Sequence, residues 1–169
     1  MGGSRCGRAI SEGRGGTADL GSLLHTSPPA GGAMRFSGVA SSVRVDRQGE
    51  RMTARALAKM AQVQRLQLLP QHGSAEAIGV VEKCWVEEGT LRVAGQLRGG
   101  DRRARQLYMR LRAGERRGLS VGGRVKEVRI EVDAVTRQRV RCIDDVELDH
   151  VAVCDVVSAQ NADTYVTVG

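Results

Sequence analysis

Three polar residues of this chain could together perform acyl-transfer chemistry: His72, Ser120 and His150. A serine hydroxyl attacks an acyl carbon when a neutral imidazole accepts its proton, and a third group must fix the tautomer of that imidazole. Glycines at 118 and 122 flank the serine, so a substrate backbone could approach closely and backbone N–H groups could bind an oxyanion. Singly, each residue is more often a surface, turn or core residue. Their combination predicts a nucleophile with a general base.

The segment from Gly118 to Gly122 also matches G-x-S-x-G, the nucleophile elbow of α/β-hydrolases. That elbow needs a strand before the serine and a helix after it. Here a charged helix end precedes Ser120, and the β-rich run GRVKEVRIEV follows. Only 49 residues remain after the serine, too few for the rest of a hydrolase domain. We therefore reject the elbow.

The elements that must position these residues are mostly strands. Alternating and β-branched runs predict strands at 34–45, 66–70, 78–85, 90–97, 124–132, 138–143, 146–157 and 164–168. One helix is expected from its cap at Thr53 to about Gln64. A second has its cap at Asp101 and its stop at Gly114, with an apolar face of Ala104, Leu107, Tyr108 and Leu111. The count favours a mainly β (α+β) fold, a closed or nearly closed barrel of about seven strands with flanking helices.

Length and composition bound this fold. A chain of 169 residues with 2% aromatic residues predicts one domain with an aliphatic core, here residues 34–169. Residues 1–33 contain nine of the 22 glycines and two of the three prolines, which predicts a disordered leader or upstream extension. They include no apolar run long enough for a signal peptide or a membrane span.

The four cysteines form no C-x-x-C pair, which argues against a zinc ribbon or a redox motif. They are Cys6, Cys84, Cys142 and Cys154. A zinc site built from Cys142, His150 and Cys154 is an alternative, but it lacks a fourth ligand. Cys154 as a nucleophile lacks flanking glycines. We expect buried thiols and no cofactor.

The formal charge of +7 is concentrated in one segment. Residues 98–129 contain eleven Lys and Arg against three acidic residues. A nucleic-acid-binding module is therefore an alternative, and its binding should weaken steeply with salt. Because most of these arginines lie opposite the apolar stripe of the second helix, a solvated face is favoured. The scarcity of aromatic residues also argues against stacking on single strands.

From Met34 onward the chain resembles the caudoviral prohead maturation proteases, which share the fold of herpesvirus assemblins. Four segments carry the resemblance: FSGVASSVRVDRQGERMTARAL, LLPQHG, RRARQLYMRLRAGERRGLSVGGRV and LDHVAVCDVV. They resemble, in order, the opening strand and turn, the strand that ends in the base, the helix leading to the nucleophile, and the late strand with the third member. The resemblance covers about 135 of the 169 residues.

The resemblance implies a Ser-His-His triad with Ser120 as nucleophile, His72 as base and His150 as third member. Asp149 and Glu147 remain possible substitutes for His150, although strand alternation points Asp149 to the opposite face. The paired arginines that help to bind the oxyanion in assemblins have no match here. Backbone N–H groups of Val121 and Gly122 are the expected oxyanion donors instead. Substrate-steering residues are expected at Arg116, Arg117 and Arg124.

The function implied is a serine endopeptidase that cleaves the propeptide of the major capsid protein precursor, scaffold, or both, inside a phage procapsid in the host cytoplasm. A homodimer is a further expectation from the assemblins, whereas a membrane or nucleic-acid partner is not expected. The alternative from another class is a non-catalytic capsid or tube-like β-barrel, because the same fold relationship extends to phage tube proteins.

Overall fold

A computed structural model describes residues 32–169 as eight strands and two helices. The strands are β1 (Arg35–Ser42), β2 (Glu50–Met52), β3 (Leu66–Leu69), β4 (Gly79–Glu87), β5 (Thr90–Leu97), β6 (Arg117–Val132), β7 (Arg139–Asp155) and β8 (Tyr165–Val168). The helices are α1 (Ala54–Met60) and α2 (Arg102–Arg112). The mainly β fold with two helices is therefore confirmed, while the predicted leader at 1–33 lies almost wholly outside the described residues.

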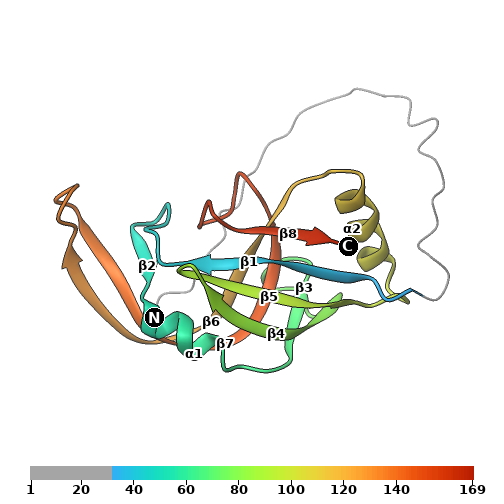
Figure 1. Ribbon diagram of the computed structural model, residues 1–169, viewed down its shortest axis with the longest axis horizontal. Coiled ribbons are helices and arrows are strands. Elements are labelled where there is room, and N and C mark those ends of the chain that lie inside the picture. The colour runs from blue at the N-terminus through green and yellow to red at the C-terminus, as the bar shows by residue number, and fades with distance from the viewer. Residues whose placement is uncertain (1–31) are drawn as a thin grey trace.

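One sheet contains all eight strands, in the order β2-β7-β3-β4-β5-β1-β8, with β6 paired to β7. The long strand β7 pairs with β6 along almost its whole length. Its remaining edge is shared by β2 and β3, both parallel to it. No ladder joins β6 to β8 within residues 32–169, so the sheet is not closed, and the expected closed or nearly closed barrel is supported only in part. The sheet curls round a core without completing the ring (Figure 1).

Local chemistry explains the boundaries of the helices. The side chain of Thr53 accepts a bond from the N–H of Ala56, and Asp101 accepts from Arg103 and Ala104, so both predicted caps are confirmed. Gly114 has a φ of 93° and follows α2 as expected. Helix α1 ends earlier than predicted, at Met60, because i→i+3 bonds tighten its last turn: the N–H groups of Gln62 and Val63 donate to Lys59 and Met60.

The short strand β2 was not predicted, and two long strands differ from the prediction. β7 is one strand where two were expected, because Asp144 is the extra residue of a bulge between Glu127↔Asp145 and Val128↔Ile143. Arg129 Nε donates to Asp144 at 2.6 Å, which offsets the burial of this carboxylate. β6 begins at Arg117 rather than 124, so Ser120 lies within a strand.

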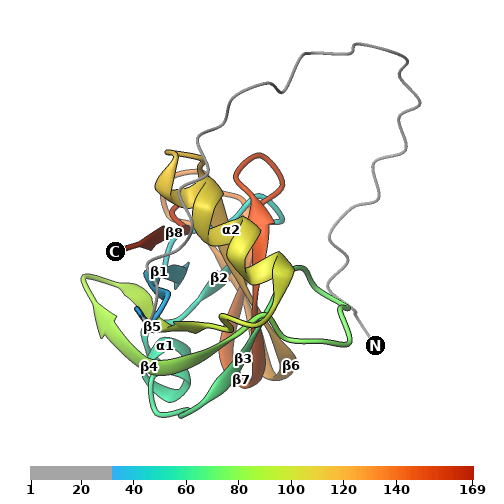
Figure 2. The same ribbon diagram turned by 90° about the vertical axis from the view of Figure 1, so that its right-hand side faces the viewer.

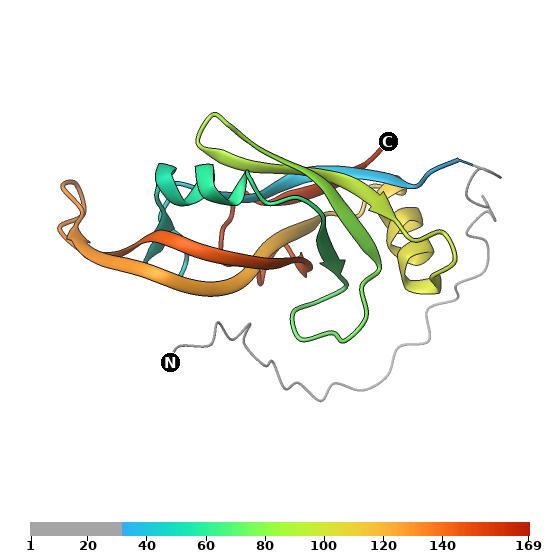
Figure 3. The same cartoon turned by 90° about the horizontal axis from the view of Figure 1, so that it is seen from below.

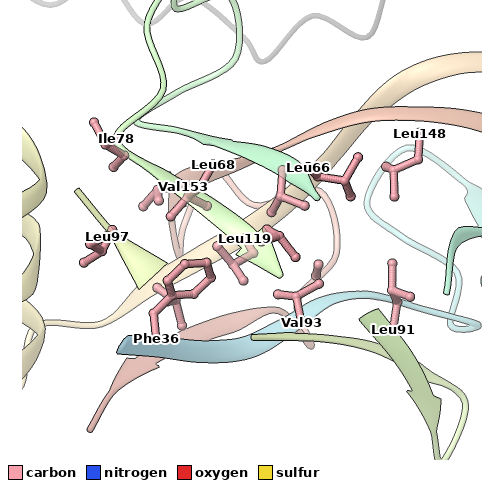
Figure 4. Close-up of a cluster of buried hydrophobic side chains, with 14 of the residues drawn as sticks. Phe36, Leu66, Leu68, Ile78, Leu91, Val93, Leu97, Leu119, Leu148 and Val153 are labelled. Atoms are coloured by element: carbon pink, nitrogen blue, oxygen red, sulfur yellow. The ribbon is translucent and has the colours of Figure 1, made fainter. Parts of the chain in front are cut away.

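The core is aliphatic, as expected, with Phe36 and Tyr108 as its buried aromatic residues. Side chains from both halves of the curled sheet meet inside it, and Figure 4 shows Leu68, Leu119 and Val153 among them. The two helices lie at opposite ends of the sheet (Figures 2 and 3). Leu119, one residue before Ser120, is 1% exposed. Its burial anchors the strand that presents Ser120.

Candidate active site

Strand β7 lies between the two strands that bring Ser120 and His72 together. On one side, β6 places Ser120 opposite Ala152 and Gly122 opposite His150. On the other side, β3 pairs Gln67 with His150. Residues opposite one another in an antiparallel pair share a face of the sheet. Ser120 and His150 therefore lie on the same face, and His150 is opposite Gly122, two residues after Ser120.

His72 lies three residues beyond β3, on a loop that returns toward this face. Gly73 follows it with a φ of 81°, a backbone conformation that favours glycine. The loop places the imidazole between Ser120 and His150. His72 Nε2 is 2.8 Å from Ser120 Oγ, and His72 Nδ1 is 2.8 Å from His150 Nε2. The two imidazole rings meet edge-on, with an interplanar angle of 66°.

Proton positions follow from these contacts. For His72 Nε2 to accept the hydroxyl proton of Ser120, the proton of His72 must be on Nδ1, from which it is donated to His150 Nε2. His150 then carries its own proton on Nδ1. That nitrogen is 3.0 Å from Asp149 Oδ2, so the carboxylate accepts from it. All three hydrogen bonds therefore point the same way: Ser120 donates to His72, His72 to His150, and His150 to Asp149.

Burial lowers the pKa of His72 below its ordinary value of 6.5, and the electrostatic interaction with the adjacent His150 lowers it further. Both effects disfavour the imidazolium form. His72 is therefore neutral at pH 7 and able to accept a proton, as a general base must be.

Asp149 and Glu147, the two possible substitutes for His150, lie differently from it. Asp149 contacts the far nitrogen of His150, and its side chain is 80% exposed. Glu147 pairs with Arg124 and Lys126, which lower its pKa to about 2. His150 is thus the group in contact with His72.

Ser120, His72 and His150 border a cavity of about 320 Å³ that reaches from His72 to the loop after β7. Its far wall includes Ser41 and Ser42 of β1 together with Asn161. Asn161 Nδ2 donates to Ser42 Oγ at 2.9 Å. Ser41, Ser42 and Asn161 are not among the site residues that the sequence predicts. The ordinary polar residue types of β1 carry no sequence signal for a site.

The expected oxyanion donors are constrained by the strand. Val121 and Gly122 line the cavity, but successive N–H groups of a strand point to opposite edges. One of the two N–H groups therefore points toward β7, and at most one points away from β7, where it could bind an oxyanion.

The expected steering arginines do not line the cavity. Arg117 pairs with Glu115 and Asp155, and Arg124 pairs with Glu147, so two of the three charges are neutralised locally. Arg116 is exposed beside them. The basic residues in the cavity wall are Arg44 and Arg51 instead. Both also contact acids, Asp163 and Glu131 respectively.

Three further predictions concern a zinc site, a membrane span and the basic segment. Among residues 32–169, no three His, Cys, Asp or Glu side chains are grouped as metal ligands, so Cys142, His150 and Cys154 form no zinc site. Over the same range, no helix is long and apolar enough to cross a bilayer. Six basic residues of the 98–129 segment are ion-paired: Arg103, Arg110, Arg117, Arg124, Lys126 and Arg129.

In serine hydrolases, the serine hydroxyl is hydrogen-bonded to an imidazole, and a further group orients that imidazole. The contacts described above have this arrangement. Comparison with known families agrees with this class: the model of the caudovirus prohead serine proteases matches residues 30–168. The chain belongs to this family and is a serine peptidase. The family indicates a role in capsid maturation, with capsid protein as substrate. A search of curated proteins finds no match to the chain.

Proposed function

We propose that this peptidase cleaves the major capsid protein precursor, scaffold, or both, during procapsid maturation, by an acyl-enzyme mechanism using Ser120, His72 and His150. One observation carries the proposal: Ser120 Oγ, His72 and His150 are joined by two contacts of 2.8 Å beside an open cavity. The sequence separations are 48 and 78 residues. Such a junction of distant polar residues is not expected from packing alone.

In the first half of the reaction, Ser120 Oγ attacks the peptide carbonyl carbon while its proton passes to His72 Nε2. The carbonyl electron pair moves to oxygen and gives a tetrahedral oxyanion. When the C–N bond breaks, the electron pair returns to the carbonyl and His72 gives its proton to the leaving amine. The product of this half is an ester between Ser120 and the acyl part of the substrate.

In the second half, water replaces the amine. His72 removes a proton from the attacking water, the ester bond breaks, and the proton returns to Ser120 Oγ. In both halves His150 accepts from His72 Nδ1 and holds the ring toward the serine. Because a neutral imidazole stabilises the imidazolium of His72 less than a carboxylate would, we expect slow turnover. Slow turnover suits a protease that acts once during assembly.

The test is co-expression with the capsid precursor from the same genome, followed by intact mass of the products. Wild type is expected to release defined fragments, and Ser120→Ala to leave the precursor whole. Ser37→Ala is the matched control, because Ser37 is an exposed serine of β1 bonded to Thr167, outside the cavity wall. Unchanged processing by Ser120→Ala would refute the assignment of the nucleophile.

A fluorophosphonate probe separates the enzyme from the alternative of a non-catalytic barrel. It should label wild type on Ser120 and leave Ser120→Ala unlabelled. Equal and negligible labelling of both proteins, with both folded, would contradict an activated serine.

A further inference from the structure

The far half of the β6–β7 hairpin carries an unusual strand edge. It projects beyond the rest of the sheet in Figures 1 and 3. In β6, three apolar residues of this half are exposed: Val128 (41%), Ile130 (52%) and Val132 (57%). They are spaced two apart, so they share one face of the strand. Across β7, Ile130 is opposite Arg141 and Val132 is opposite Arg139, so no apolar partner covers them there.

The outer edge of this strand is also open. β6 pairs with β7 alone among the strands of residues 32–169, so its second row of backbone N–H and C=O groups has no ladder partner there. Natural edge strands are usually protected by bulges, proline or lysine. Here Lys126 and the bulges lie before Val128, and Val128–Val132 contains neither lysine nor proline. This stretch is regular, apolar on one face, and carries one basic and one acidic residue, Arg129 and Glu131, on the other.

We propose that a second copy of this chain pairs with this edge, antiparallel, about a two-fold axis through Ile130. A two-fold axis perpendicular to the sheet keeps every side chain on its own face. The axis must therefore pass beside one residue, which lies opposite the same residue of the other copy. If that residue is Ile130, Val128 opposes Val132 of the other copy. Arg129 opposes Glu131 of the other copy. Apolar residues then meet on one face and opposite charges on the other.

Neighbouring registers lack this match. An axis through Arg129 would place Arg129 against itself and Glu127 against Glu131. An axis through Glu131 would oppose two glutamates. An axis through Val128 would place Lys126 against Ile130. The five residues are therefore self-complementary in one two-fold register, as an isologous interface requires. The next opposed pair, Glu127 and Asp133, is acidic on both sides, and Glu127 is ion-paired with Arg55 of its own chain.

A pairing of this length buries less than the roughly 1,200 Å² of a stable standard interface. The association is therefore weak and depends on concentration. The first experiment is sedimentation of the full-length Ser120→Ala protein from about 10 to 500 µM, a range suited to weak dimers. We expect a reversible monomer–dimer equilibrium in this range.

Ile130→Lys places two like charges on the axis, and it should weaken the dimer at least about tenfold. The matched control is Val157→Lys, which makes the same change of type at an exposed residue (86%) outside β6, and it should leave the equilibrium unchanged. A protein that stays monomeric throughout the range overturns the proposal. So does a dimer that survives Ile130→Lys.

Cross-linking tests the register, in a background where Cys6 and Cys84 are replaced by serine. Ile130→Cys should oxidise to a disulfide with its own copy. Val128→Cys should cross-link in a mixture with Val132→Cys and only weakly alone, because these positions oppose each other. Efficient self-cross-linking of Val128→Cys contradicts this register. A variant of Ile130 that only reduces capsid-precursor cleavage, with no change in association, would mean that the edge takes substrate instead.

Discussion

The imidazole of His150 lies directly against the backbone of Gly122, its cross-strand neighbour. A Cβ atom at position 122 would lie 2.2 Å from His150 Nε2 and 2.3 Å from Cε1. No side chain other than hydrogen fits there while the ring stays in place. The glycine therefore opens the space in which His150 reaches His72.

Gly122→Ala is predicted to displace His150 and reduce peptidase activity by about 10- to 100-fold while the protein remains folded. The double variant with His150→Ala should be no slower than the worse single variant, because both remove one contact. Activity on a peptide spanning a mapped cleavage site would be measured beside thermal melting. Gly100→Ala is the control, since a Cβ there meets nothing within 4 Å. Additive losses in the double variant would show that Gly122 acts by another route.

Activity is predicted to rise with pH through an apparent pKa below 6.5. His72 must be neutral to accept the proton of Ser120, and burial and the electrostatic interaction with His150 both lower its pKa. Below that pKa the imidazolium form dominates and attack stops. A pH–rate profile of kcat/KM, taken with folding monitored by circular dichroism, provides the check. A rising limb well above pH 7 would contradict a depressed pKa for His72.

His150→Ala is predicted to lower kcat by about 10- to 100-fold, less than His72→Ala, because an orienting member contributes less than the base. His150→Gln should recover part of the loss if its side-chain oxygen accepts from His72 Nδ1. Steady-state kinetics of the three variants would show the order. Loss as complete in His150→Ala as in Ser120→Ala would assign His150 a larger part than orientation.

Asp149→Asn is predicted to reduce kcat only about two- to tenfold, since its side chain is mostly exposed and solvent screens its charge. Asp149 acts through His150 as a positioning residue, so the variant should also move the pH profile and leave KM unchanged. Glu147→Gln is the matched control: it removes a charge two residues away that pairs with Arg124 and Lys126. Equal effects of the two variants would mean a general charge effect.

Local signals in the sequence predicted the elements that local chemistry controls. Asp101 capped α2 as expected, and the hairpin of β4 and β5 turns at Glu88 and Gly89, both with positive φ. The closure of the sheet could not be predicted, since it depends on curvature and on which distant edges meet.

Position 122 shows why part of the site was harder to predict. The glycines around Ser120 are also typical of a loop, and so the strand was expected to start only at 124. In the structure, the absence of a side chain at Gly122 leaves room for the imidazole of His150, a residue 28 positions later. Periodicity within one segment contains no information on such a contact. The chemistry of the residue types first grouped the three polar residues, and the family resemblance added their roles; in the structure their side chains lie in contact.

The placement of β7 between β6 and β3 also has a consequence for synthesis. A nascent chain that has emerged only through β6 already carries Ser120 and His72, yet it lacks the strand that aligns them. The β6–β7 pairing is a local hairpin, but the β3–β7 pairing joins segments far apart in the sequence, and such pairings form later. We therefore expect Ser120 and His72 to stay unaligned in a chain that ends before β7, so that peptidase activity requires this complete strand.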